Sequence, residues 1–103
     1  MGLRLRISPQ TLSLLEALLV HPTRWHHGYA LSQQTGLASG TLYPILMRLE
    51  KRKWLETRWE DPGVTGRPPR HLYRLTSDGR EWAREEMEDA RARKIWKPAY
   101  TGV

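Results

Sequence analysis

One stretch of the sequence indicates the fold most clearly: Ser39-Gly40-Thr41-Leu42-Tyr43-Pro44-Ile45-Leu46-Met47-Arg48-Leu49-Glu50-Lys51-Arg52. Its aliphatic residues recur at the spacing i, i+3, i+4 and i+7, which predicts a helix that buries one face. These inward positions are Leu42, Ile45, Leu46 and Leu49. The opposite face holds small, polar and basic side chains. We therefore expect a helix over residues 39–52, capped by Ser39, with its polar face turned outward.

A shorter helix is expected just before it, over residues 29–35. Gly28 can begin this helix, and Gly36 suits the left-handed residue that ends it, with Leu37 folding back as an apolar contact. Only residues 36–38 then separate the two helices. This is the spacing of a helix-turn-helix.

Another helix precedes this pair. Ser8 offers a capping hydroxyl, and Pro9 suits the first helical position. The core-facing stripe of this helix consists of Leu14, Leu15, Leu18 and Leu19. Pro22 ends the helix near His21.

Two strands and a last helix follow. Residues 54–60 are rich in β-formers, and residues 70–76 read as the return strand. The connecting loop is rich in Gly, Pro and Arg, which predicts a protruding hairpin tip. Thr76 or Ser77 then caps a highly charged helix that runs to about Lys94. The fold class expected is mainly α with a small β-hairpin, a winged helix-turn-helix plus one C-terminal helix.

Composition limits the possible functions. The chain has 103 residues, with 17 Lys and Arg against 11 Asp and Glu, a formal net charge of +6. This charge favours polyanions such as nucleic acid or an anionic membrane surface. The longest apolar stretch, residues 12–20, is much shorter than the roughly 20 residues of a membrane span. The start of the chain lacks a signal-peptide pattern. We therefore expect a soluble, cytoplasmic protein with no membrane partner.

Metal and cofactor sites are not expected. The chain has no Cys, which excludes disulfides and thiolate metal sites. His21, His26 and His27 lie around one loop, but no acidic residue stands at ligand spacing beside them.

Several motifs resemble those of one family. The run from Gly40 to Glu50 is similar to the third-helix signature of the PadR-like (phenolic-acid repressor) family of transcriptional regulators. His27-Gly28-Tyr29 resembles the opening of the family's second helix. Residues 66–76 resemble its wing and last strand, and residues 77–79 the start of its final helix. The match spans roughly residues 8–90.

The resemblance implies a winged-helix homodimer that binds a pseudo-palindromic operator in double-stranded DNA, usually as a repressor and sometimes released by a small ligand. The domains would be residues 1–76 for DNA binding, 77–96 as the dimerisation helix, and 97–103 as a flexible tail.

The chain departs from the family at two points. The family commonly has Gly where this chain has Lys53, so either Lys53 is left-handed or the turn differs. Longer members have a larger C-terminal dimerisation domain, whereas we expect this chain to end soon after one C-terminal helix. It would have to dimerise through its fourth helix, with or without the first.

The outward face of the third helix can enter a major groove, which admits one helix. There Thr41 offers a hydroxyl and a methyl group, Tyr43 can reach a phosphate or a base edge, and Pro44 can pack on a thymine methyl. The DNA-binding candidates are Tyr29, Ser32, Gln33, Ser39, Gly40, Thr41, Tyr43, Pro44, Arg48, Lys51, Thr65, Arg67 and Arg70.

Plainer interpretations remain open for several of these candidates. Pro44 breaks helical hydrogen bonding, which marks either a functional surface or a harmless early-helix proline. The arginines of the hairpin suit phosphate contacts, but a solvated turn would also carry them. The candidates in the second helix form either a phosphate contact or only a polar outer face.

The tryptophans suggest packing and dimer contacts. Trp54, Trp59 and Trp82 are interpreted as core or helix–hairpin packing. Trp82, Met87 and Trp96 are candidates for dimer or ligand contacts. Trp96 either lines an apolar pocket between subunits, where a small aromatic effector would bind, or makes a simple dimer or tail contact.

The sequence leaves two other function classes to consider. A winged-helix module that binds proteins without DNA is the main alternative, since fold alone cannot exclude it. An enzyme is disfavoured, because the sequence has no Cys nucleophile, no phosphate-cradling Gly motif and no recognised nucleophile motif.

Overall fold

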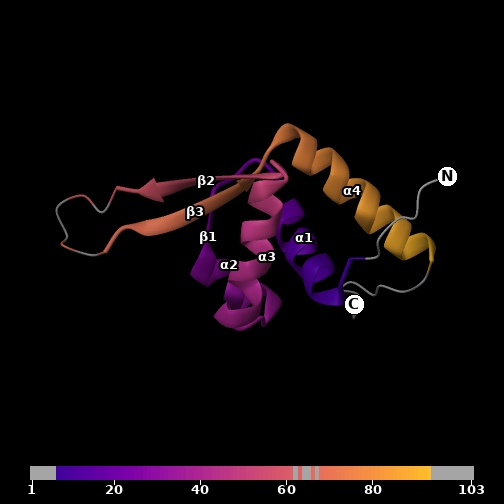
Figure 1. Cartoon of the computed structure of the whole chain (residues 1–103), viewed down its shortest axis with the longest axis horizontal. Coiled ribbons are helices and arrows are strands. Elements are labelled where there is room, and N and C mark those ends of the chain that lie inside the picture. Colours follow the sequence, from indigo (N-terminus) through magenta and orange to yellow (C-terminus); the bar gives the residue numbers. More distant parts are fainter. Residues whose placement is uncertain (1–6, 62, 64–65, 67, 94–103) are drawn as a thin grey trace.

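The computed structural model describes residues 7–61, 63, 66 and 68–93 and has the winged-helix arrangement that the sequence predicts (Figure 1). The elements are α1 (Pro9–Val20), β1 (His26–His27), α2 (Gly28–Thr35), α3 (Ser39–Lys51), β2 (Leu55–Glu60), β3 (Arg70–Leu75) and α4 (Ser77–Ala92). The strands form one antiparallel sheet in the order β1-β3-β2. The β2–β3 hairpin extends away from the helices, and α4 lies along α1 (Figure 1).

The core is built from the aliphatic faces of the four helices and the inner ends of β2 and β3. Its largest fully buried side chains are Leu14, Leu15, Leu18, Leu31, Leu42, Leu46 and Leu75. Burying one such side chain stabilises the fold by about 1.5–3 kcal/mol. The leucine-lined face of α3 is therefore fixed against the other helices, which determines which side of α3 remains outward.

Most of the expected helix boundaries are confirmed. The Ser8 hydroxyl accepts a hydrogen bond from the Thr11 N–H at 3.1 Å, and Pro9 opens α1. Gly36 ends α2 with φ 74°. One prediction is wrong: Ser39 is already inside α3, and the N-cap is Ala38, which makes no side-chain capping bond. The helix begins one residue earlier than a Ser39 cap would require.

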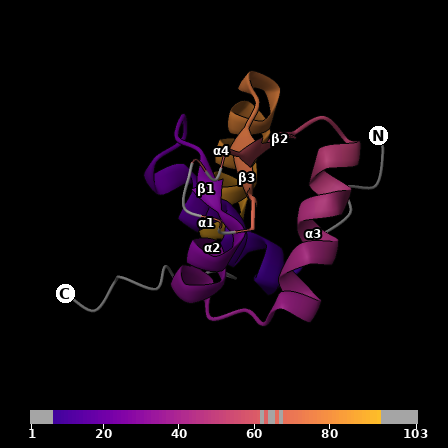
Figure 2. The ribbon, with the colours of Figure 1, turned by 90° about the vertical axis from the view of Figure 1, so that its left-hand side faces the viewer.

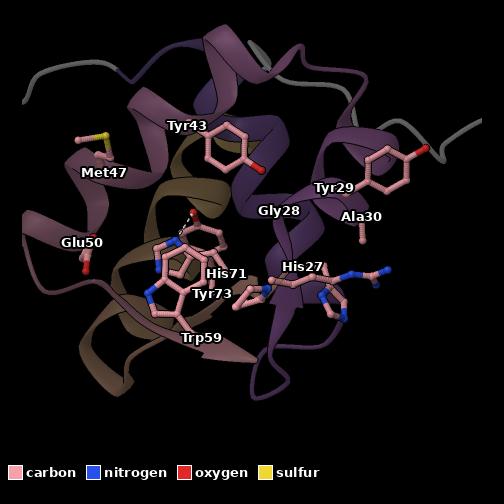
Figure 3. A pocket seen from close by; sticks show the side chains of 12 residues that line it. His27, Gly28, Tyr29, Ala30, Tyr43, Met47, Glu50, Trp59, His71 and Tyr73 are labelled. Atoms are coloured by element: carbon pink, nitrogen blue, oxygen red, sulfur yellow. Dashed lines mark hydrogen bonds between the residues drawn. The ribbon is translucent and has the colours of Figure 1, made fainter. Parts of the chain in front are cut away.

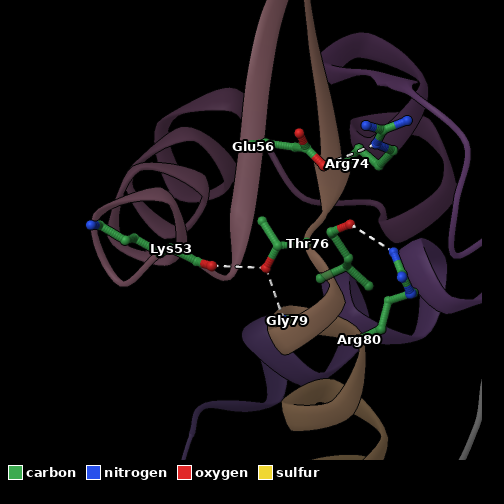
Figure 4. A network of polar contacts seen from close by, with 7 residues as sticks. Lys53, Glu56, Arg74, Thr76, Gly79 and Arg80 are labelled. Atoms are coloured by element: carbon green, nitrogen blue, oxygen red, sulfur yellow. Dashed lines mark hydrogen bonds and ion pairs between the residues drawn. The ribbon is translucent and has the colours of Figure 1, made fainter.

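Lys53 adopts the left-handed conformation, with φ 62°. Of the two expectations for this position, a left-handed lysine in place of the family's glycine is therefore the correct one. The Lys53 carbonyl accepts a hydrogen bond from the Thr76 hydroxyl at 2.8 Å, and the same hydroxyl accepts one from the Gly79 N–H at 2.9 Å (Figure 4). Thr76 therefore caps α4 and ties it to the turn after α3.

The packing prediction is correct for two of the three tryptophans and wrong for the third. Trp54 and Trp82 stack in parallel, with ring centroids 3.8 Å apart, and both pack against the core. Trp59 contradicts the packing interpretation, because 65% of its surface is exposed. It lies near the outer end of the hairpin, where the strand has run past the helices that would cover it (Figure 1).

The strand β1 was not predicted. It has two residues and pairs with β3, placing His26 opposite Tyr73. A sequence of two histidines carries no strand pattern, so only the pairing with β3 defines it. In the described part of the chain, none of the helices combines the length and apolar character needed to cross a membrane.

Candidate nucleic-acid interface

The outward face of α3 is open in the folded chain. Its inward leucines and Ile45 are at most 5% exposed. The opposite positions are exposed: Ser39, Gly40, Thr41, Pro44, Met47, Arg48 and Lys51. Figure 2 shows α3 at one edge of the molecule, beside the hairpin. The subunit's own core therefore leaves this side of the helix uncovered, and a helix of this diameter fits a major groove.

Tyr43 is oriented differently from its neighbours on that face. Its side chain is 38% exposed, and its hydroxyl lies directly over Gly28 at the start of α2. Its ring centroid is 6.4 Å from that of Tyr73 on β3. A side chain at position 28 would collide with the Tyr43 hydroxyl. Gly28 therefore makes room for Tyr43 to connect α3 with α2 and β3.

The candidates in α2 have different surroundings. Tyr29 is 74% exposed at the start of the helix, and Gln33 is also exposed. The Ser32 hydroxyl donates a hydrogen bond to the Leu37 carbonyl at 2.7 Å. Ser32 thus stabilises the turn between α2 and α3, while Tyr29 has a free surface.

The hairpin adds one exposed basic residue to the candidates. Arg70 begins β3, opposite Glu60, and is exposed. Thr65 and Arg67, which were also predicted to contact DNA, lie outside the described residues. Arg70 is therefore the described basic residue nearest the hairpin tip among the candidates.

A groove separates α3 from the hairpin and contains several of these residues (Figure 3). Its volume is about 990 Å³. Three predicted DNA contacts, Tyr29, Tyr43 and Arg70, line it. The rest of its lining was not predicted as a site: His27, Gly28, Ala30, Met47, Glu50, Trp59, Pro69, His71 and Tyr73.

Aromatic rings form a continuous series along the hairpin wall of this groove. Trp59 stacks on His71, with centroids 4.4 Å apart and planes 8° apart. His71 in turn lies 4.7 Å from Tyr73, and its Nδ1 is hydrogen-bonded to the Tyr73 hydroxyl at 3.1 Å. The alternation of Leu55, Thr57 and Trp59 in the sequence places Trp59 on this face.

Burial and neighbouring charge keep Tyr73 neutral. Burial is the main cause that raises the pKa of Tyr73 to about 12, and Tyr43 and Glu50 add smaller contributions. Its hydroxyl therefore stays a hydrogen-bond donor across the physiological range. Glu50 and Tyr73 both line the groove.

The histidines near the groove have structural partners. His26 is buried, and its Nε2 donates to the His21 carbonyl at 3.0 Å. Burial lowers the pKa of His26. His27 Nε2 lies 3.7 Å from a carboxylate oxygen of Glu60. Among the described residues, no group of three or more His, Asp or Glu is arranged to hold a metal ion.

Two of the three dimer candidates, Trp82 and Met87, lie on α4. Met87 is 3% exposed and belongs to the core between α4 and α1. Trp82 is occupied by its stack on Trp54, and Trp96 lies outside the described residues. A second groove, about 610 Å³ in volume, runs between α1 and α4 and is lined by Glu16, Leu19, Val20, Arg84, Met87, Glu88 and Arg91.

Comparison with known proteins gives a family match over most of the core. The profile of the transcriptional regulator PadR-like family matches residues 15–85. A comparison with curated protein sequences found no match.

Three solved structures show the same fold. The smu.1704 protein of Streptococcus mutans UA159 is 27% identical, with a TM-score of 0.68 over 90% of this chain and 88% of its own. A PadR family transcriptional regulator of Eggerthella lenta DSM 2243 is 27% identical, with a TM-score of 0.62 over 84% of this chain and 77% of its own. The PcaV transcriptional regulator of Streptomyces coelicolor, solved with its natural ligand, is 27% identical. Its TM-score is 0.63, over 86% of this chain and 57% of its own.

Proposed function

Because the chain belongs to the PadR-like family of transcriptional regulators, we propose that it binds a specific sequence in double-stranded DNA as a homodimer and represses transcription. The observation that carries this proposal is the uncovered face of α3, where Thr41, Pro44 and Arg48 are exposed while the leucines opposite are buried. This face enters the major groove, and the N-terminal half of α3 reads the base edges.

The hairpin supplies the second contact. Arg70 and the arginine at position 67 lie on phosphates or in the adjacent minor groove. Lys51 and Arg48 extend the basic surface along α3, and Tyr29 reaches the backbone from α2. The formal net charge of +6 favours this polyanionic partner over a neutral one.

A twofold dimer forms along α1 and α4. The groove between these helices combines an apolar floor with two acids and two arginines, Glu16, Glu88, Arg84 and Arg91. Val20 at its edge is 53% exposed. Because a twofold axis places the same patch against itself, this balanced set can pair acids with arginines across the interface. The helix α4 (Ser77–Ala92) then acts as the dimerisation helix, and the protein works in the cytoplasm.

Selection of bound sequences from random duplex DNA tests the DNA-binding proposal. We expect enrichment of a pseudo-palindrome whose half-sites are about 10 base pairs, or a multiple, apart. Thr41→Ala should weaken binding to the selected site but not to scrambled DNA, because Thr41 would read base edges. No enrichment would favour the alternative of a protein-interaction module.

Analytical ultracentrifugation tests the dimer. Val20→Glu should shift the protein towards monomer, because it places an extra acid in the proposed interface. Gln34→Glu makes the same change of charge at an exposed position on α2 and should leave the dimer intact. Equal behaviour of the two variants would locate the interface elsewhere.

A further inference from the structure

The groove between α3 and the hairpin has the lining of a site for a flat cation. Its walls include the rings of Tyr43, Trp59, His71 and Tyr73 (Figure 3). Trp59 is 65% exposed although its ring is held in a fixed stack on His71. Aromatic faces attract cations through their quadrupole and also stack on other flat rings.

Glu50 adds a negative charge to this aromatic lining. One of its carboxylate oxygens accepts a hydrogen bond from the Thr57 hydroxyl at 3.0 Å, which fixes it at the inner end of the hairpin. In the described part of the chain, Glu50 forms no ion pair. A carboxylate without a cation beside several aromatic faces is complementary to an organic ammonium group.

The other charged residue of the groove stands apart from Glu50. Arg70 begins β3 opposite Glu60, three residues along β2 from Thr57. Arg70 and Glu50 are both exposed to solvent, so water screens both charges. The register places Tyr73 opposite Thr57, to which Glu50 is bonded, whereas Trp59 and His71 are next to Arg70.

We propose that this groove binds a planar aromatic ammonium compound, with its ring against Trp59 and Tyr43 and its ammonium group towards Glu50. The effect on DNA binding rests on the proposed function. An occupied groove no longer admits DNA, because its two walls, α3 and the hairpin, are the elements proposed to contact the duplex. The ligand would then release the regulator from its operator.

NMR titration of the full chain with three matched naphthalene compounds tests the site without DNA. The probes are 2-naphthylmethylammonium, the neutral 2-naphthalenemethanol and the anionic 2-naphthoate. A ligand of this size at ordinary efficiency has a Kd on the order of 1 mM. We expect the ammonium to bind most tightly and the carboxylate most weakly, each shifting the indole N–H signal of Trp59, which Trp59→Phe identifies.

Variants and a saturated analogue separate the two parts of the claim. Glu50→Gln should lower the affinity for the ammonium about fivefold and leave the alcohol unchanged, since only the charge contact is lost. Glu85→Gln, an exposed acid on α4, is the control and should change neither. Decahydro-2-naphthylmethylammonium should bind at least about fivefold more weakly than its aromatic counterpart, because it cannot stack. Equal affinities in either pair would overturn the proposal.

A competition experiment tests the release. At ten times its Kd, the ammonium probe should raise the apparent Kd for the selected DNA about tenfold. Methylammonium at the same concentration controls for ionic strength and should have a much smaller effect. If DNA binds but no probe shifts Trp59, the groove site is refuted and the proposed function stands. If the probes bind as expected and no duplex does, the proposed function is refuted instead.

Discussion

Lys53 occupies a backbone conformation that most residues avoid. Its φ of 62° is left-handed, which costs an L-residue roughly 1–2 kcal/mol. The turn keeps this conformation because it joins α3 to β2 and because the Lys53 carbonyl accepts a hydrogen bond from the Thr76 hydroxyl. The Thr76 hydroxyl, which caps α4, is thus also bonded to a strained residue 23 positions earlier in the chain.

Lys53→Gly should therefore stabilise the protein. Glycine removes the steric cost but increases the entropy of the unfolded chain, so we expect a net gain of about 0.5–1 kcal/mol. Chemical denaturation measures the change. Lys53→Ala, which loses the same side-chain charge but keeps the Cβ, is the control and should show no gain. If alanine stabilises as much as glycine, the charge and not the backbone is responsible.

His26 makes the stability depend on pH. Burial lowers its pKa below the ordinary value of 6.5, so the unfolded chain takes up a proton first as the pH falls. Stability therefore decreases as the pH drops below about 6.5, and the decrease ends once the folded state is protonated too. The slope from this single group is at most about 1.4 kcal/mol per pH unit.

Urea denaturation at pH 7.5 and 5.5 checks this expectation. His26→Gln retains a donor for the His21 carbonyl but cannot titrate. We expect the wild type to lose more stability between the two pH values than the variant does, by up to about 1 kcal/mol. The same loss in both proteins would assign the pH dependence to other groups.

At the scale of elements, two glycines have opposite surroundings. A Cβ at Gly79 would overlap the carbonyl of Trp54, whereas a Cβ at Gly40 would meet nothing within 4 Å. Gly79 permits the close approach of α4 to the turn before β2 (Figure 4). Gly40 has no such packing reason in the free protein, and it lies on the face proposed to meet DNA.

Alanine at these two positions should therefore act differently. Gly79→Ala should destabilise the fold by about 2–3 kcal/mol, as for an overpacked site. Gly40→Ala should stabilise α3 by about 0.5 kcal/mol, because alanine is the better helix former. Yet it should weaken DNA binding, since the methyl group would keep the backbone from the groove. Thermal unfolding and anisotropy titration measure the two effects; normal DNA affinity for Gly40→Ala would argue against close approach there.

The sequence predicted the elements that carry their own periodicity. The spacing of Leu42 to Leu49 identified α3 and its free face, and Gly36 identified the end of α2. The strand β1 could not be found this way, because a pair of histidines becomes a strand only when β3 lies beside it. Element ends shift by single residues for similar reasons, as the cap at Ala38 shows.

The groove could not be predicted because four separate segments build it. Alternation placed Trp59 on the same face as Leu55, and that much of the pattern was correct. Leu55 is 2% exposed and Trp59 65% exposed, however, because the hairpin extends past the helices that cover its base. A pattern in one strand gives the side on which a residue lies, but not how far the rest of the fold extends over it.

At the scale of the whole molecule, charge determines how binding responds to salt. Arg48, Lys51, Arg67 and Arg70 would give each subunit about four phosphate contacts. Each contact releases about 0.9 counterion, so the slope of log K against log salt for a dimer should be near −7. Such a slope requires both subunits to hold one duplex, which links the face of α3 to the α1–α4 interface on the other side.

Arg70→Ala should make this slope less steep by about 2, one contact from each subunit, and should weaken binding to all duplexes alike. Arg58→Ala is the matched control, because Arg58 lies on the same face of the hairpin as Arg70 but its guanidinium group packs over the ring of Trp25 at 4.5 Å. Its slope should stay close to that of the wild type. Anisotropy titrations from about 50 to 200 mM salt give the slopes. If both variants lower the slope equally, the hairpin attracts DNA only through its total charge, and Arg70 makes no specific contact with a phosphate.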